Sequence, residues 1–278
     1  MKLTANQHHY INLGAESRKR LRAIAQRAFT HQGNYYIYSP PGLGKTFTIE
    51  QEAINRNVDM YELKGNASMW AFTVQMALIM LHHPKNTPAI LFIDDCDTLL
   101  TQVDSVNTMK IALAEKRLQY NKSLSGQYNQ LEEIEQMAID AFRTKEGKIS
   151  IPLGNMTIIW ASNYQLADQV KTASATTDNQ RQKYINEEAL RRRMNKIADY
   201  TLEGDILWGW VADCILNETP SNMTNATLEE KNEILWFMHK SWDNLKEHNI
   251  SVAEKLYEEM LLDPDGYPTT WDLDYLVA

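Results

Sequence analysis

One stretch decides the fold of this chain: Ser39-Pro40-Pro41-Gly42-Leu43-Gly44-Lys45-Thr46. It follows an apolar run at residues 35–38 and precedes a helical pattern at residues 47–55, the strand–loop–helix setting of a phosphate-binding loop. The glycines let successive backbone N–H groups curl around a β-phosphate, Lys45 reaches the β- and γ-phosphate oxygens, and Thr46 offers a hydroxyl to Mg²⁺. Ser39 departs from the general pattern, which has glycine there. We predict that this stretch binds a nucleoside triphosphate; the alternative is a plain Pro/Gly turn before a helix.

The composition limits the setting in which the chain works. Its 278 residues suit one large or two small domains. No apolar run approaches the roughly 20 residues of a membrane span, and the N-terminus lacks the apolar core of a signal peptide. The two cysteines, Cys96 and Cys214, form no metal-binding pattern or disulfide framework. We therefore expect a cytoplasmic protein with no membrane partner.

The charge is unevenly distributed along the chain. The formal net charge is −8, yet residues 201–278 hold four lysines against sixteen acidic residues, a balance of −12 that leaves +4 for residues 1–200. This asymmetry suggests different partners for the two parts, although an acidic helical face is more often simply solvated.

Apolar runs alternate with helical patterns up to about residue 203, which predicts an α/β fold. Runs without polar alternation indicate strands that are buried on both faces, and strands that alternate with helices indicate a parallel sheet with right-handed crossovers. The expected strands lie at residues 35–39, 58–63, 89–93, 156–160 and 197–202. The expected helices lie at residues 15–29, 47–55, 68–81 and over much of 105–143.

From residue 204 the pattern becomes wholly helical. The expected helices are residues 205–217, 228–248 and 251–262, with a short one near Trp271, and Ser251 with Glu254 reads as a capping box. Four tryptophans in this part are expected to form the core of a small helical module rather than a base-stacking platform: Trp208, Trp210, Trp236 and Trp242. We predict a nucleotide-binding α/β domain at residues 1–203 and a small all-α domain at residues 204–278.

A second site element follows the third expected strand. Asp94 can hold the hydration shell of Mg²⁺ opposite Thr46, and Asp95 can polarise an attacking water molecule. Acids that follow an apolar strand about fifty residues after a phosphate-binding loop are a strong combination.

With both motifs in place, the chain resembles the AAA+ family of P-loop ATPases over residues 30–203. Residues 39–46 resemble its Walker A motif and residues 90–95 its Walker B motif. Asn163, at the end of the fourth expected strand, resembles its sensor 1. Residues 188–193 stand where the family carries its arginine finger, and the helical end of the chain resembles the family's lid. The long basic segment between Walker B and sensor 1 is similar to that of phage-encoded AAA+ proteins.

The resemblance implies a five-stranded core, ATP with Mg²⁺ at subunit boundaries, and ring or spiral homo-oligomers, most often hexamers. It assigns Thr46 and Asp94 to the metal. The implied nucleotide-binding residues are Ser39, Pro40, Pro41, Gly42, Leu43, Gly44, Lys45, Thr46 and Phe47. The implied catalytic residues are Asp95, Asn163, Arg193 and Arg192.

Two positions depart from the family pattern. Asp95 stands where glutamate is usual, and its shorter side chain would place the carboxylate about 1.5 Å further from the water, enough to slow hydrolysis or leave an ATP-bound switch. No arginine follows Arg193, so the family's sensor 2 arginine is missing. We expect the sensor 2 function to be absent, with Lys255 the best of four cationic candidates if one replaces it. Arg193 itself is either a finger that acts on a neighbouring subunit or a cation at a helix C-terminus.

The macromolecular substrate stays open between two classes. Four basic residues recur with Tyr120 along one expected helical segment, either as a stripe that tracks a nucleic-acid backbone or as a solvated face: Lys110, Lys116, Arg117 and Lys122. Residues 69–72 carry aromatic side chains that suit either a polypeptide-gripping pore loop or a helix core. We expect an ATPase of DNA transactions such as replication, recombination or loading. The alternatives are a protein-remodelling ATPase and a nucleotide-gated scaffold with little hydrolysis.

Overall fold

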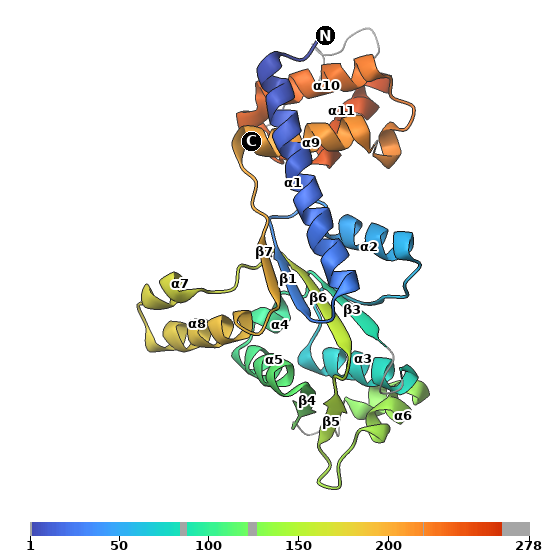
Figure 1. Cartoon of the computed structure of the whole chain (residues 1–278), viewed down its shortest axis with the longest axis vertical. Helices are drawn as coiled ribbons and strands as arrows, with labels where there is room; N and C mark the ends of the chain where they lie inside the picture. The colour runs from blue at the N-terminus through green and yellow to red at the C-terminus, as the bar shows by residue number, and fades with distance from the viewer. Residues whose placement is uncertain (1, 84–87, 122–126, 219, 263–278) are drawn as a thin grey trace. The chain divides into compact units, whose positions relative to one another are not determined.

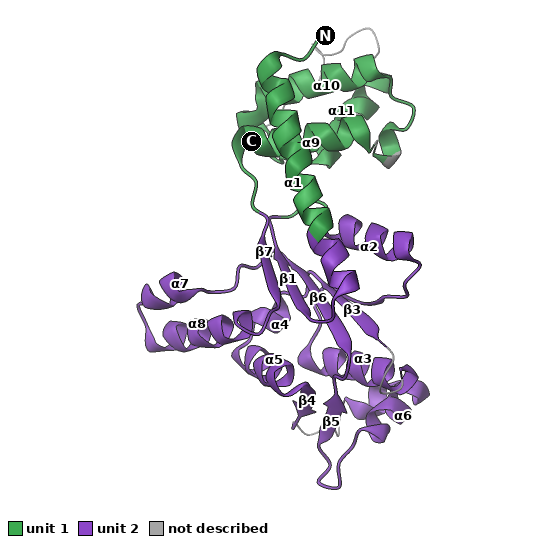
Figure 2. Cartoon of the chain, viewed as in Figure 1, with its two compact units in different colours: residues 1–23, 41–44, 201–278 green, residues 24–40, 45–200 purple. Residues whose placement is uncertain are grey.

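The computed structural model describes residues 2–83, 88–121, 127–218 and 220–262 (Figure 1). The short helix expected near Trp271 lies outside these residues. By its internal contacts the chain forms two compact units, a helical unit of residues 1–23, 41–44 and 201–278 and a sheet unit of residues 24–40 and 45–200 (Figure 2). The functional boundary expected between residues 203 and 204 stays a prediction. Among the described residues, no helix is both long and apolar enough to cross a bilayer.

A five-stranded parallel sheet in the order β2-β3-β6-β1-β7 forms the centre of the sheet unit. Its strands are β1 (Asn34–Tyr38), β2 (Tyr61–Lys64), β3 (Ala89–Asp94), β6 (Met156–Ser162) and β7 (Lys196–Asp199). Every residue of β3 and β6 is buried, as the uninterrupted apolar runs predicted. The α/β prediction is confirmed. The register pairs Asp94 with Ala161 and Tyr38 with Ser162, so the carboxyl ends of β1, β3 and β6 lie together at one edge.

Helices connect these strands. They are α2 (Lys45–Arg56), α3 (Met69–His82), α4 (Thr98–Thr101), α5 (Val103–Glu115), α6 (Glu133–Ala141), α7 (Gln169–Ala173) and α8 (Asp178–Arg191), with a 3₁₀ turn η1 (Tyr128–Gln130). Ser68 fixes the start of α3 by accepting a hydrogen bond from the Ala71 N–H. The helix expected at 68–81 therefore begins at Met69, directly after the serine that caps it.

The expected helical run over residues 105–143 is wrong in its middle. The helix α5 ends at Glu115, because Lys116 adopts a left-handed conformation with φ 49°. Strand β4 (Arg117–Tyr120) follows and pairs antiparallel with β5 (Ile149–Pro152). The four residues of β4 alternate between exposed and buried side chains, which is the period of a half-buried strand rather than a helix. The basic residues 110, 116 and 117 therefore do not form one helical stripe, and Lys122 lies outside the described residues.

The helical unit contains α9 (Gly204–Asn217), α10 (Leu228–Ser241) and α11 (Ile250–Leu262), with 3₁₀ turns η2 (Ser221–Met223) and η3 (Trp242–Asn244). It also contains the first part of α1 (Ala5–Thr30), which crosses α9 at two glycines. A Cβ atom on Gly14 would lie 2.3 Å from the Gly209 carbonyl carbon, so only glycine permits this approach. Arg18 adds an ion pair to Asp213 at 2.8 Å.

The predictions for the helical unit are correct for its helices and need two corrections in detail. The helix expected at 228–248 ends at Ser241, and η3 follows it. The capping box at Ser251 is wrong, because α11 already begins at Ile250 and the Val252 N–H donates to Asn249 Oδ1 at 3.3 Å. Asparagine is as good an N-cap as serine, and it stands earlier in the chain. Three of the four tryptophans are buried as expected: Trp208, Trp210 and Trp242.

Candidate functional site

Lys45, at the start of α2, is buried to 5% exposure. Its Nζ donates to Asn163 Oδ1 at 2.8 Å, to the Ser39 carbonyl oxygen at 2.9 Å and hydroxyl at 3.0 Å, and to the Pro40 carbonyl oxygen at 3.2 Å. All four acceptors are uncharged. Burial lowers the pKa of Lys45, and nearby carboxylates, Asp95 first among them, oppose this shift. Among the described residues, the Lys45 ammonium therefore has no charged hydrogen-bond acceptor.

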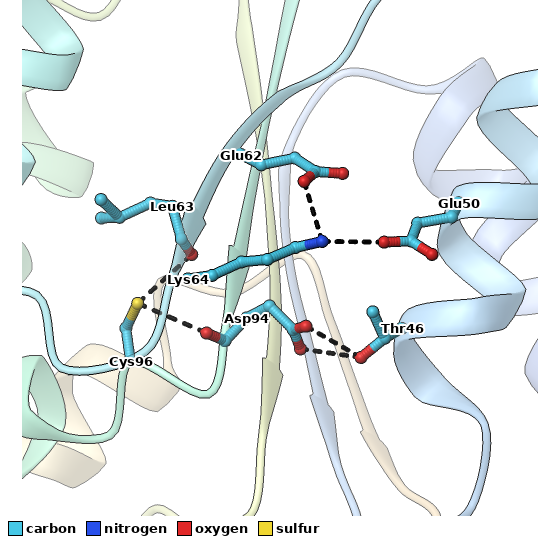
Figure 3. Close-up of polar contacts among 7 residues, drawn as sticks. All are labelled: Thr46, Glu50, Glu62, Leu63, Lys64, Asp94 and Cys96. Carbon is cyan, nitrogen blue, oxygen red and sulfur yellow. Dashed lines mark hydrogen bonds and ion pairs between the residues drawn. The ribbon is translucent and has the colours of Figure 1, made fainter.

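Thr46 and Asp94 face each other across the same edge of the sheet. The Thr46 hydroxyl donates to the Asp94 carboxylate, at 3.0 Å from Oδ1 and 2.9 Å from Oδ2 (Figure 3). Asp94 ends β3 and is buried, and this burial raises its pKa while the Thr46 hydroxyl opposes the rise. Hydroxyl and carboxylate oxygens are the ligands that Mg²⁺ prefers, so this pair fits the metal that the sequence predicts.

Asn163 joins Lys45 to the second acid of the site. Its Nδ2 donates to Asp95 Oδ1 at 3.0 Å, while its Oδ1 accepts from Lys45. Asp95 is exposed and adopts φ 52°, a left-handed conformation that its own N–H fixes by donating to the Ala161 carbonyl oxygen at 3.0 Å. Such a conformation costs about 1–3 kcal/mol in a non-glycine residue and is found mainly where the surrounding structure holds a functional group in place.

A sequence-family comparison decides where the chain belongs. The model of the "ATPase family associated with various cellular activities (AAA)" matches residues 35–198, more than half of the chain. The chain belongs to the AAA family. The order of its five strands is that of the AAA+ fold. Among curated proteins, no sequence matches it.

Solved structures resemble this AAA protein only distantly. PCH-2 of C. elegans shares 14% identity over 90% of this chain and 69% of its own, with a TM-score of 0.34. The RuvB Holliday junction branch migration motor of Thermotoga maritima shares 15% over 92% and 70%, with a TM-score of 0.35. Domain III of the replication initiation protein DnaA of Thermotoga maritima shares 14% over 87% and 91%, with a TM-score of 0.32.

The two predicted arginines lie apart from the cluster around Lys45. Arg193 donates from Nη1 to the Ala189 carbonyl oxygen of its own helix, and Arg192 pairs with Glu188. In the described part of the chain, no hydrogen bond or ion pair joins either arginine to Lys45, Asp95 or Asn163. Arg192 lines a surface hollow of about 480 Å³ together with Gln169, Thr172, Ala173, Ala175, Arg181 and Glu188.

The remaining residues of the site are the loop glycines, Phe47 on α2, and Lys64 beside Asp94. Gly42 and Gly44 have φ 82° and 69°, the left-handed region that favours glycine, and Phe47 is 52% exposed on α2. Lys64, the register partner of Asp94, lies 2.9 Å from Glu50 on α2 and 2.9 Å from Glu62 (Figure 3).

Cys96 lies beside the acids without a chemical role. Its Sγ donates to the Leu63 carbonyl oxygen at 3.3 Å, and burial raises its pKa to about 11. Cys96 therefore stays protonated and acts as a small buried side chain rather than a nucleophile.

Sequence reasoning missed two buried polar contacts behind the site. The Ser162 hydroxyl donates to Asp97, whose pKa is raised by burial. Glu187 of α8 is fully buried and accepts from the Tyr164 hydroxyl at 2.7 Å and the Ala167 N–H at 3.0 Å. Ser162 directly precedes Asn163 at the end of a strand, so its place near the site could have been predicted from the sequence. Glu187 lies in a polar helical stretch, and nothing in that stretch predicts its burial.

Proposed function

We propose that this AAA protein binds ATP with Mg²⁺ at residues 39–47, hydrolyses the ATP, and uses the cycle in a ring or spiral homo-oligomer to act on a macromolecule. The observation that carries the proposal is the chain of contacts from Asp95 through Asn163 to Lys45, beside the Thr46–Asp94 pair. All five residues lie at the carboxyl edge of one parallel sheet, where α/β folds bind their ligands. The cytosolic setting expected from the cysteines stays a prediction.

Each side chain has a definite task in this proposal. Lys45 would exchange uncharged acceptors for phosphate oxygens, which strengthens its hydrogen bonds because the new acceptors are charged. Thr46 and Asp94 would hold Mg²⁺, which supplies charge neutralisation to the phosphates when bound. Asp95 would accept a proton from the attacking water, and Asn163 would orient Asp95 and the γ-phosphate.

The geometry of Asp95 supports slow hydrolysis. Its short carboxylate is tied to Asn163, and its backbone is fixed by the bond to Ala161. Neither constraint extends the reach of the side chain toward a water molecule. A scaffold that binds ATP and barely hydrolyses it is the limiting case of this proposal.

The basic residues favour a nucleic acid as the macromolecule. Lys116 and Arg117 are both exposed at the start of the β4–β5 pair, and Arg117 donates to the Ser150 hydroxyl at 3.0 Å across it.

The aromatic residues at 69–72 give less support to a polypeptide-gripping loop than the sequence suggested. Trp70 is only 8% exposed, and its ring centroid lies 5.3 Å from that of Tyr120. A buried tryptophan packs the core and offers no grip on a passing chain.

One measurement tests the proposal directly: the ATPase rate with and without single- and double-stranded DNA, at two salt concentrations. We expect a slow basal rate that requires Mg²⁺ and Lys45 and that rises with DNA at low salt. ATP binding without DNA stimulation would leave the nucleotide site and remove the DNA assignment. An absence of ATP binding would overturn the whole proposal.

A further inference from the structure

Two side chains of the helical unit lie against the glycines of the phosphate-binding loop. A Cβ atom on Gly44 would lie 3.3 Å from Cζ2 and 3.6 Å from Cη2 of Trp210. A Cβ atom on Gly42 would lie 3.0 Å from Cβ and 3.7 Å from Nδ2 of Asn249. All four residues belong to the helical unit. Glycine is thus required at both loop positions for its positive φ, and the neighbouring side chains leave little room for anything larger.

Trp210 is held rigidly in this place. It follows Gly209, where an added Cβ atom would lie 2.0 Å from the Tyr10 carbonyl oxygen of α1. This backbone contact, with the Arg18–Asp213 ion pair one turn further along α9, fixes the helix that carries the tryptophan. Trp210 is 2% exposed and therefore closely packed. If the loop shifts, the indole ring must either move with the loop or lose contact with it.

Its neighbour Trp208 shows what a purely structural tryptophan looks like in the same helix. The Nε1 of Trp208 donates to the Leu235 carbonyl oxygen at 3.3 Å. The buried Nε1 of Trp210 has no hydrogen-bond acceptor among the described residues. In an indole, Nε1 and Cζ2 are bonded to the same ring carbon, so the unused N–H lies on the edge that faces Gly44. A buried donor without an acceptor calls for an explanation beyond core packing.

We infer that Trp210, together with Asn249, couples phosphate binding at Gly42 and Gly44 to the helical unit; the inference rests on the proposed ATP-binding function. The indole ring supports the loop in a conformation whose N–H groups can surround phosphate oxygens. When the phosphates of a nucleoside triphosphate accept hydrogen bonds from these N–H groups, the loop backbone shifts. The indole ring is in direct contact with the loop, so it moves as well. Trp210 is therefore a positioning residue, and its fluorescence reports nucleotide binding.

The first test compares two tryptophans in the full-length protein. Tryptophan emission is titrated with ATP and Mg²⁺ for wild type, Trp210→Phe and Trp208→Phe, while equilibrium dialysis measures nucleotide binding independently. We expect Trp210→Phe to abolish the nucleotide-dependent part of the emission and to weaken binding about three- to tenfold, because the loop is less preorganised. Trp208→Phe removes a hydrogen bond from the same helix, yet it should retain the signal and the affinity.

A second pair of variants avoids the core altogether. Asn249→Asp keeps the oxygen that accepts from the Val252 N–H and exchanges the exposed hydrogen bond from Nδ2 to Glu247 for an exposed like-charge contact. It places a negative charge beside Gly42, so we expect ATP affinity to fall about tenfold. Asn225→Asp makes the same chemical change at an exposed position of the same unit and should leave affinity unchanged. This pair decides the matter if Trp210→Phe fails to fold.

The outcomes separate this inference from the function on which it rests. Wild type that binds no nucleotide in dialysis overturns the proposed function and the inference together. Wild type that binds nucleotide, with Trp210→Phe retaining full signal and affinity, overturns the inference alone. Equal affinities for Asn249→Asp and Asn225→Asp would likewise overturn it.

Discussion

The Thr46 hydroxyl lies within 3.0 Å of both carboxylate oxygens of Asp94 in this AAA protein. The contact joins the first turn of the helix after the phosphate-binding loop to the end of β3. Both side chains carry oxygen atoms of the kind that Mg²⁺ prefers, but the hydrogen bond itself gives the buried carboxylate a neutral partner. We therefore expect the ionised Asp94 to destabilise the ligand-free protein near neutral pH.

Asp94→Asn should stabilise the ligand-free protein near neutral pH. Burial raises the pKa of Asp94 above its ordinary value of 3.8, so the folded state holds this proton more tightly than the unfolded chain does. The stability that Asp94 contributes is present below 3.8 and is lost as the pH rises through the folded pKa. We expect the melting temperature of Asp94→Asn to exceed that of wild type by a few degrees above this window and to match it in strong acid.

Thermal melts against pH, without nucleotide or Mg²⁺, measure this difference. Asp59→Asn, at an exposed position, removes a carboxylate without changing a buried one and should show no such gain. Asp94→Asn should also lose Mg²⁺-dependent nucleotide binding. A variant less stable than wild type at neutral pH would show that the Asp94 charge stabilises the fold.

Lys45→Ala should weaken nucleotide binding by about 100-fold or more, because it removes a buried cation from the phosphate site. Lys64→Ala is the matched control, since Lys64 is a lysine near Asp94 whose partners are Glu50 and Glu62. Isothermal titration with ATP and Mg²⁺ measures both variants. Wild-type affinity in Lys45→Ala would mean that residues 39–46 are not the phosphate-binding loop.

The residues that carry the strand–loop–helix chemistry could be predicted from the sequence because their signals are local. Residues 89–94 are apolar and end in an acid, and the loop has two glycines, so the strand, the loop and their order follow from neighbouring residues. Parallel pairing then brings Asp94 and Asn163 to one edge without further information.

The missed features depend on contacts between distant residues or on a single backbone angle. Lys116 ends α5 by adopting a left-handed conformation, which the sequence does not predict because the residue is not a glycine. The strand that follows it has only four residues. Trp210 and Asn249 reach the loop through tertiary packing, and no spacing in the sequence expresses this. Burial of Glu187 likewise depends on residues that lie twenty or more positions away.

Asp95→Glu should raise the turnover of this AAA protein. The added methylene moves the carboxylate toward the attacking water by about 1.5 Å, and a gain of 1 Å in placement can change a rate by about a hundredfold. Asp95→Asn should retain ATP binding and trap an ATP-bound oligomer. Steady-state phosphate release and size-exclusion chromatography with ATP measure the two effects. Unchanged turnover in both variants would remove Asp95 from the mechanism and direct attention to Asp97.

Arg193→Ala should bind ATP normally but lose hydrolysis, because in the proposed homo-oligomer its guanidinium, which donates to the Ala189 carbonyl oxygen within the chain, would act on the nucleotide of a neighbouring subunit. An arginine supplied in this way is worth about 10³–10⁵ in rate in related enzymes. Mixing Arg193→Ala with Asp95→Asn subunits should restore part of the activity, since a shared site can take one intact half from each. Arg181→Ala, which removes an exposed arginine from α8, is the control. No rescue despite co-assembly would exclude action between subunits.

Replacing Lys116 and Arg117 with alanine should weaken DNA binding if the start of β4 contacts phosphates. Each lost contact should reduce the slope of log K against log[salt] by about 0.7–0.9, so the double variant tests both the affinity and its electrostatic origin. Nucleotide affinity should be unchanged, because neither residue belongs to the loop or to the acids around it.

The control replaces Lys19 and Arg20 on α1, which removes the same charge from exposed positions elsewhere. If both double variants lower the slope equally, the effect reflects net charge alone. If neither changes DNA binding and a polypeptide partner instead stimulates hydrolysis, protein remodelling becomes the better explanation.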